Sequence, residues 1–154
     1  MVAGRSNERS LAAPSPGGRI VYAGAIAVLA SLLLPWYGIP FSHGLSVTGL
    51  DSFGFAHIAL LITVGAAVLL VAREVADRPL PRPLSSADLV VVAGAWAALL
   101  TVYLLVDRPD ELGGSTEIGV RMGIFVALGG CVAIVIGGLR MRAEERSAAA
   151  ERPG

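Results

Sequence analysis

The sequence has few charged side chains and no lysine. Charged residues make up 16% of the 154 residues, all 12 basic residues are arginines, and the formal net charge is zero. The arginines are scattered along the chain, whereas a nucleic-acid surface needs them clustered on one face. We therefore expect no nucleic-acid partner.

The chain also lacks the residues of common catalytic sites. It has no Gly-rich phosphate loop and no HExxH, GxSxG or CxxC pattern. Its one cysteine, Cys131, cannot form a disulfide within the chain. Because Cys131 lies inside an apolar run, a packing role is favoured over a reactive or lipidated thiol. We predict no enzymatic activity, no catalytic residues and no cofactor.

Apolar residues are abundant and gather in long runs. They make up 55% of the chain, above the roughly 45–50% of a soluble domain. An 18-residue helix is about 27 Å long, close to the roughly 30 Å hydrocarbon core of a bilayer. The predicted fold is an all-α transmembrane bundle of four helices, up-down-up-down, because short connectors make sequential spans antiparallel neighbours. The predicted spans are residues 20–37, 55–72, 89–106 and 118–139, with tails at residues 1–19 and 140–154.

The arginines divide unequally between the two sides of this predicted bundle. Ten lie in the N-terminal tail, the connector after the second span and the C-terminal segment, and only Arg108 and Arg121 lie on the other side. By the positive-inside rule, both termini are expected to be cytoplasmic. A cleaved secretory signal ending at Ala30 is the alternative, but cleavage there would leave only Ile20–Ala27 as its apolar region, so the uncleaved anchor is favoured.

Local patterns refine the ends of the spans. Thr48-Gly49-Leu50-Asp51 and Ser85-Ser86-Ala87-Asp88 have capping-box spacing, which places the start of the second span near Gly49 and of the third near Ser86. Trp36 and Tyr37 close the first span, where amphipathic rings suit the outer headgroup level.

The segments outside the spans differ in composition, and their predicted structures differ accordingly. Residues 10–18 have too little apolar surface to order and should be flexible, whereas residues 140–150 favour a prolonged fourth helix. The first connector is unusually apolar, and Leu45-Ser46-Val47-Thr48 alternates like a strand. This loop could fold over the bundle or present an apolar patch to a partner.

Small residues recur at four-residue spacing in three of the spans. In lipid, such residues let helices approach closely and so drive their association. The second span has fewer of them and is expected to show the most surface to lipid or to another protein. Whether these stripes pack within one chain or between copies stays open. The stripes are Ala23, Ala27 and Ser31; Ala93, Ala97 and Thr101; and Gly119, Gly123, Ala127 and Cys131.

No ionisable side chain lies at the middle of a predicted span, although transport and proton relay depend on such groups. The hydroxyls of Ser31, Thr63 and Thr101 can bond back to their own helices. Trp96 is interpreted as a large packing residue whose indole N–H needs a partner or a path to the headgroups.

Two groups nearer the outer side could bind an ion. His43, Asp51 and His57 offer imidazole and carboxylate ligands, but their spacing fits no compact metal motif, so we predict no metal site. In the third connector, Arg121 and Asp107 are expected to form a structural ion pair. Cation capture by the carboxylates is the alternative. These acidic residues are Asp107, Asp110, Glu111 and Glu117.

Four short segments resemble a loose group of small four-span integral membrane proteins of unknown function from actinobacteria. The similarity covers about residues 20–140. It implies the same topology and a plasma-membrane location, and it implies no activity. The chain lacks the paired cysteines of claudin-like first loops. The similar segments are Leu34-Pro35-Trp36-Tyr37, Thr48-Gly49-Leu50-Asp51-Ser52-Phe53, Leu105-Val106-Asp107-Arg108-Pro109 and Gly119-Val120-Arg121-Met122-Gly123.

These observations together predict a non-enzymatic integral membrane protein. It would act by helix association, as an accessory, scaffolding or regulatory subunit. Its expected surroundings are the lipid bilayer and another membrane protein or further copies of the chain. The alternative is a small transporter or channel subunit whose pathway forms between copies.

Overall fold

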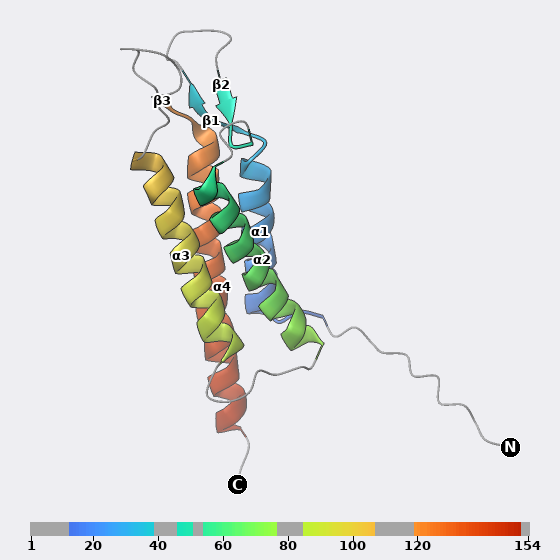
Figure 1. The fold of residues 1–154 in the computed structure, drawn as a ribbon. Helices are drawn as coiled ribbons and strands as arrows, with labels where there is room; N and C mark the ends of the chain where they lie inside the picture. Colours follow the sequence, from blue (N-terminus) through green and yellow to red (C-terminus); the bar gives the residue numbers. More distant parts are fainter. Residues whose placement is uncertain (1–12, 39–45, 51–53, 77–84, 107–118, 152–154) are drawn as a thin grey trace, which may run out of the picture.

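The computed structural model describes residues 13–38, 46–50, 54–76, 85–106 and 119–151. The main body of this part of the chain consists of four helices that run alternately up and down (Figure 1). They are α1 (Pro16–Ser31), α2 (Phe55–Val75), α3 (Ser86–Val106) and α4 (Met122–Ala150). By length and composition, α2, α3 and α4 could each cross a membrane. The helical architecture is therefore confirmed, and three of the four helices have the predicted membrane-spanning character.

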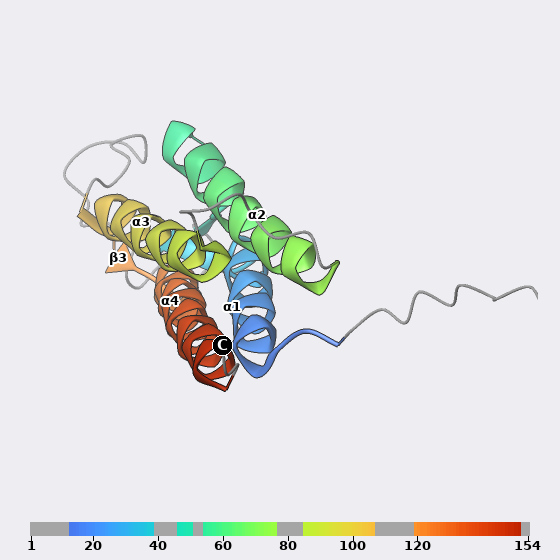
Figure 2. The same ribbon diagram turned by 90° about the horizontal axis from the view of Figure 1, so that it is seen from below.

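The helices close into a ring in the order α1, α2, α3, α4. The most extensive contact joins α1 to α4, followed by α3 with α4 and α2 with α3, while α1 and α2 share a smaller contact. Seen from below, α1 lies between α2 and α4 (Figure 2). Sequential helices are neighbours, as the short connectors predict. The first and last helices complete the ring.

Glycines bring the backbones of α1 and α4 into direct contact. A Cβ atom built on Gly24 would lie 2.6 Å from the carbonyl oxygen of Gly130, and one built on Gly130 would lie 2.7 Å from that of Gly24. One heptad away, Gly17 and Gly137 form the same reciprocal contact, at 2.8 and 2.9 Å. Because these positions have no room for a side chain, the four glycines set the spacing of the two helices.

α3 also approaches α4 through small residues. A Cβ atom on Gly94 or on Gly138 would lie within 3 Å of a side chain of the opposite helix. Near the middle of this interface, Thr101 Oγ1 and Cys131 Sγ are 3.6 Å apart. Cys131 is buried there, in agreement with its expected packing role.

The predicted stripes of small residues are largely buried in α4 and α3, whereas in α1 only Ser31 of the stripe is buried. The buried members are Gly123, Ala127 and Cys131 in α4 and Ala97 and Thr101 in α3. In α1, however, Gly24 faces α4 while the neighbouring Ala23 is exposed. A glycine permits a closer backbone approach than an alanine, so the glycine heptad rather than the alanine stripe forms the interface.

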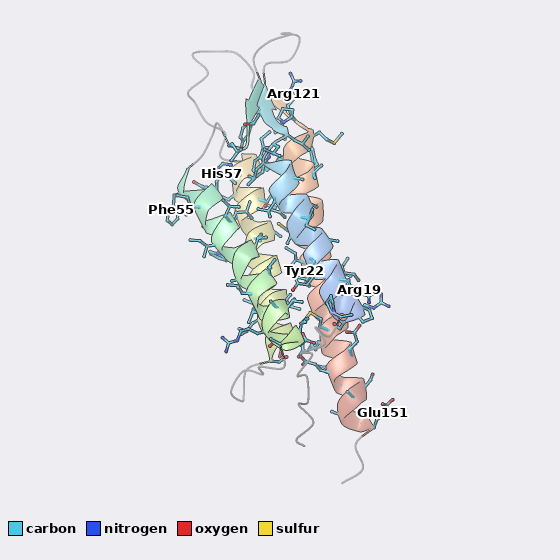
Figure 3. The ribbon with its side chains drawn as sticks, turned by 90° about the vertical axis from the view of Figure 1, so that its right-hand side faces the viewer. Arg19, Tyr22, Phe55, His57, Arg121 and Glu151 are labelled. Atoms are coloured by element: carbon cyan, nitrogen blue, oxygen red, sulfur yellow. The ribbon has the colours of Figure 1, made fainter. Side chains whose placement is uncertain are left out.

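A small antiparallel sheet covers one end of the bundle, which we call the sheet end. Its strands are β1 (Pro35–Gly38), β2 (Ser46–Thr48) and β3 (Gly119–Val120), in the order β2-β1-β3. Tyr37 of β1 lies opposite Val47 on one side and Val120 on the other. The strand at Ser46–Thr48 confirms the predicted alternation, whereas β1 and β3 were not expected. The opposite end, where Glu151 lies, is called the tail end (Figure 3).

α1 begins before the predicted start at Ile20. The Ser15 hydroxyl accepts a hydrogen bond from the Gly18 amide at 3.2 Å, and Pro16 occupies the first turn, where its missing N–H costs nothing. Residues 16–19, predicted to belong to a flexible tail, are therefore helical. A capping serine followed by proline outweighs the low apolar content of this segment.

α1 also ends before the predicted boundary at Tyr37. The amides of Leu32, Leu33 and Leu34 each donate a hydrogen bond to the carbonyl oxygen three residues earlier, and the helix ends at Ser31. Pro35 cannot donate within a helix, and it disfavours the helical conformation of the residue before it. The chain therefore leaves the helix and forms β1 while its residues are still apolar.

The other helix boundaries depend on the sheet. α3 begins at Ser86, as its capping pattern predicts. α2 begins at Phe55 rather than near Gly49, because Gly49 directly follows β2. α4 begins at Met122 rather than at residue 118, because the two residues of β3 pair with β1 first, and it continues to Ala150.

Candidate functional site

Trp36 forms the centre of the packing at the sheet end. Its indole is fully buried, and its N–H donates to the Ser31 carbonyl oxygen at 2.7 Å. A Cβ atom on Gly123 would lie 2.4 Å from the indole ring, and one on Gly49 would lie 2.8 Å from it. The absence of side chains at both glycines therefore makes room for the ring. Trp36 is a core residue just beyond the end of α1, where it joins β1 to α4, and its level in the membrane stays a prediction.

In the same region, Tyr37 connects β1 to α3, and Arg121 connects the start of α4 to β1. The buried Tyr37 hydroxyl donates to the carbonyl oxygen of Leu104, one of the last-turn carbonyls of α3 that lack a helical partner. The Arg121 amide donates to the Trp36 carbonyl oxygen at 2.8 Å. The Arg121 guanidinium lies so close to β1 that a Cβ atom on Gly38 would be 2.6 Å from its Nε.

His57 lies in the first turn of α2 and is buried. Its ring centroid is 5.1 Å from that of Trp36, at an interplanar angle of 46°. Its Nδ1 accepts a hydrogen bond from the Gly54 amide at 3.4 Å. The ring therefore caps α2 and packs on the indole, and both contacts are structural.

The proposed ion-binding groups are only partly placed by the structure. His43 and Asp51 lie outside the described residues, as do all four carboxylates of the third connector, including Asp107. Among the residues that are described, no three His, Cys, Asp or Glu side chains are grouped so that they could hold a metal ion. The absence of a metal site, the acidic cation site and the Arg121–Asp107 pair therefore stay predictions from the sequence.

The described interior of the bundle is apolar apart from His57 at the sheet end and a few hydroxyls that bond locally. Ser31 Oγ donates to the Val28 carbonyl oxygen at 2.6 Å, and Thr101 Oγ1 donates to that of Ala97 at 2.9 Å. Thr63 does the same within α2, at 2.7 Å. These bonds confirm the predicted back-bonding to the preceding turn. They leave no chain of polar groups along the part of the interior that the structure describes.

The tail end carries most of the described charge. Glu144 of α4 accepts a hydrogen bond from the Gly17 amide at 3.2 Å, and the Arg140 guanidinium lies 3.9 Å from the same carboxylate oxygen. This carboxylate therefore meets the first turn of α1, where free amides and the helix dipole favour an anion. Arg19 lies on the outside of that turn (Figure 3), and its Nε donates to the Pro14 carbonyl oxygen.

α3 is tied to α4 at the same end. Arg142 and Asp88 form an ion pair at 3.1 Å, and the Ser85 hydroxyl donates to Glu145 at 2.7 Å. These contacts explain why α4 stays helical beyond its apolar part: its polar turns dock on the first turns of α1 and α3.

The outer faces of the helices are strongly apolar. Trp96, expected to be a packing residue, is 54% exposed on the outside of α3, close to the exposed Leu99 and Tyr103. Two glycines, Gly65 on α2 and Gly129 on α4, have no atom within 4 Å of the position a Cβ atom would take. α2 is largely exposed, as predicted, but α3 is no more buried than α2.

Comparison with known proteins gives no match. No protein-family model, no curated protein and no solved structure is similar to the chain. The resemblance to four-span actinobacterial membrane proteins therefore stays a prediction.

Besides the four-residue stripes, the sequence contains a seven-residue spacing that predicts the contact between α1 and α4. Gly17, Gly24 and Ser31 form one heptad series, and Gly123, Gly130, Gly137 and Glu144 form another. Two heptad series of small residues on helices that run in opposite directions predict an antiparallel contact between α1 and α4.

Proposed function

We propose that the protein is an integral protein of the plasma membrane with four spans and cytoplasmic termini, which acts by association with another membrane protein or with further copies of itself. It would serve as an accessory, scaffolding or regulatory subunit, without catalysis. The apolar outer faces and the lack of a polar route through the described interior support this role.

The inclusion of α1 as the fourth span rests on its packing. α1 has only 16 residues, about 24 Å of helix. It lies against α4, which has the length and composition of a span, and exposes Ile26 and Leu29 on its outside. Two helices in such close contact share one environment, so we place α1 in the membrane with α4.

The proposed orientation rests on the arginines. Five of the six described arginines belong to the tail end, and only Arg121 belongs to the sheet end; Figure 3 shows Arg19 and Arg121 at opposite ends. The positive-inside rule then assigns the tail end to the cytoplasm. The tail-end arginines are Arg19, Arg73, Arg140, Arg142 and Arg146.

The exposure of Trp96 is the observation that supports association most directly. It is the central residue of α3, ten positions from each end, so its indole would lie near the middle of the bilayer. Tryptophan prefers the headgroup level, where its N–H can be hydrated. At mid-depth, an N–H without an acceptor in the described part of this chain favours an acceptor on another helix.

Site-specific photocrosslinking in the native membrane tests this face. A photoreactive amino acid at position 96 should yield adducts with one defined protein, identified by mass spectrometry, whereas the same group at Ile62, which is also exposed but lies on α2, should not. Trp96→Phe keeps the ring but removes the N–H, and it should weaken the captured complex about 3- to 30-fold. Equal adducts at both positions, or only uncrosslinked chain at position 96, would contradict association through α3.

Extraction and labelling test the membrane assignment itself. The protein should stay in the membrane pellet at alkaline pH and dissolve only in detergent. Single cysteines placed at Ser147 and at Met122, in a Cys131→Ser background, should be labelled by an impermeant thiol reagent from opposite sides of the membrane. Release by alkali, or labelling of both positions from the same side, would refute the proposed topology.

A further inference from the structure

The first turn of α2 meets the rest of the bundle mainly through the ring of His57. This side chain is 2% exposed, whereas the neighbouring Phe55 and Ile58 are 85% and 45% exposed. Figure 3 shows Phe55 and His57 at the start of α2, at the sheet end. The ring centroid of His57 is 5.1 Å from that of Trp36. The attachment of this turn to the packing around Trp36 therefore depends mainly on one side chain.

The hydrogen bond of this ring requires one protonation state. Nδ1 of His57 accepts from the amide of Gly54, the residue that precedes α2. An imidazole nitrogen accepts a hydrogen bond only while it carries no hydrogen, and a neutral ring has one such nitrogen. The ring that caps α2 is therefore neutral, with its hydrogen on Nε2.

A second proton on the ring would remove both of its contacts. The imidazolium form has two donors and no acceptor, so an Nδ1–H group would face the Gly54 N–H group. The positive charge would also lie at a fully buried position, where an ion loses its hydration. Attraction of the cation to the indole of Trp36 returns less free energy than this loss of hydration costs. The protonated ring is therefore driven out of the packed position.

Arg121 adds a positive charge at the same end. Its guanidinium lies beside β1, the strand that contains Trp36, so it would repel a second positive charge on His57. The described charges of α1, α2 and α3 all lie at the tail end. The other titratable groups that the described residues place at the sheet end are the hydroxyls of Tyr37 and Tyr103.

We propose that His57 is a proton-operated latch at the sheet end. In its neutral form the ring caps α2 and holds the first turn of that helix against Trp36, and in its protonated form it releases the turn. The latch is independent of association through Trp96 on α3. In the proposed topology the sheet end faces the outside of the cell, so the latch responds to external acid, but the release itself does not depend on that topology.

Fluorescence of Trp36 in the detergent-purified full chain tests the latch. The chain has two tryptophans, so Trp96→Phe leaves Trp36 as the only reporter. The pH is lowered from about 8 to about 5, a range in which histidine titrates while most carboxylates stay ionised. The wavelength of the emission maximum and quenching by acrylamide both report how far the indole is exposed.

The emission of Trp36 should move to longer wavelength as the pH falls, and acrylamide should quench it several-fold more at the acidic end. Both changes should reverse when the pH is restored. His57→Gln in the same background is the matched control. A glutamine at this position of a capping box can accept the Gly54 amide at every pH, so the emission of this variant should stay at its neutral value.

Nitrogen-15 NMR of the histidine rings tests the same assignment without altering His57. The chain has two histidines, so His43→Gln leaves His57 as the only one. At neutral pH the spectrum should show hydrogen on Nε2 and none on Nδ1. The fraction of doubly protonated ring should then follow the emission change of Trp36. This measurement decides the matter even where His57→Gln loosens the fold at every pH.

Three outcomes would overturn the latch. The first is an emission of Trp36 that does not change over this pH range. The second is an equal change in His57→Gln, which would place the titrating group elsewhere; its loss in Asp51→Asn, a position outside the described residues, would identify that group. The third is hydrogen on Nδ1 of His57 at neutral pH, which would exclude the cap. None of these results bears on association through α3 or on membrane insertion, which have their own tests.

Discussion

The adjacent glycines Gly129 and Gly130 should respond in opposite ways to the same substitution. In Gly130→Ala, the new Cβ atom would lie 2.7 Å from the Gly24 carbonyl oxygen and 2.8 Å from a Val28 methyl carbon. Ordinary van der Waals contact begins at 3.4 Å, so the helices must separate locally by about 0.7 Å. Overpacking of this kind typically costs about 1–3 kcal/mol. In Gly129→Ala, the Cβ atom meets open space, and the free energy of unfolding should stay the same or rise by up to about 1 kcal/mol, because alanine favours a helix more than glycine does.

Titration with sodium dodecyl sulfate in mixed micelles, followed by far-UV circular dichroism, measures this difference. We expect Gly130→Ala to unfold at a clearly lower mole fraction of dodecyl sulfate, and Gly129→Ala to unfold at the wild-type mole fraction or somewhat above it. Gly24→Ala should resemble Gly130→Ala, because its Cβ atom would meet the Gly130 carbonyl oxygen at 2.6 Å. Similar midpoints for Gly129→Ala and Gly130→Ala would refute the argument that backbone contact sets the helix spacing.

Three further predictions concern other contacts. Tyr37→Phe removes the hydrogen bond to the Leu104 carbonyl and leaves a buried acceptor unpaired, so it should lower the unfolding free energy by about 1–3 kcal/mol in the same assay. Tyr22→Phe is the control: it changes a half-buried ring and should alter the unfolding free energy by less than about 0.5 kcal/mol. Asp88→Ala and Arg142→Ala should show a coupling energy below about 1 kcal/mol in a double-mutant cycle, because both side chains are more than 40% exposed. A larger coupling energy, or one that persists in high salt, would contradict an ion pair that solvent screens. Cys131 should react with N-ethylmaleimide only after unfolding, and mass spectrometry that finds a modified native chain would show that the α3–α4 contact opens.

Interactions between residues close in sequence were sufficient to predict parts of the fold. Ser86 starts α3 because a serine cap followed by an acidic residue acts within a single turn. The hydroxyl of Thr101 bonds back to Ala97 because both groups belong to one helix. Such features depend only on neighbours in sequence, and the sequence therefore predicts them.

Contacts between distant segments decided the features that the sequence did not predict. Pro35–Gly38 is apolar enough to end a span, but it forms a strand because Gly119–Val120 is available to pair with it. In α1, the alanine stripe and the glycine heptad are both plausible contact surfaces. Gly130 and Gly137 of α4 decide in favour of the glycines, since glycine opposite glycine gives the shortest helix separation.

The charged tail end shows the same division. The unequal distribution of arginines along the chain predicts which end of the bundle carries most of them. It does not predict which polar side chain of α4 meets α1, because that depends on the rotation of the two helices about their axes. The position of Glu144 beside Gly17 fixes that rotation.

The closure of the ring by α1 and α4 has a consequence for synthesis. The Glu144 carboxylate that meets the Gly17 amide is 127 residues downstream of it. At about 5–20 residues per second, the ribosome needs roughly 6–25 s to deliver that partner. Under the proposed topology, the glycine surface of α1 is in the membrane during this interval without its own partner, and other nascent helices can occupy it. A chain truncated before α4 would therefore present this surface permanently, as a mark of incomplete assembly that membrane proteases or insertion factors could recognise.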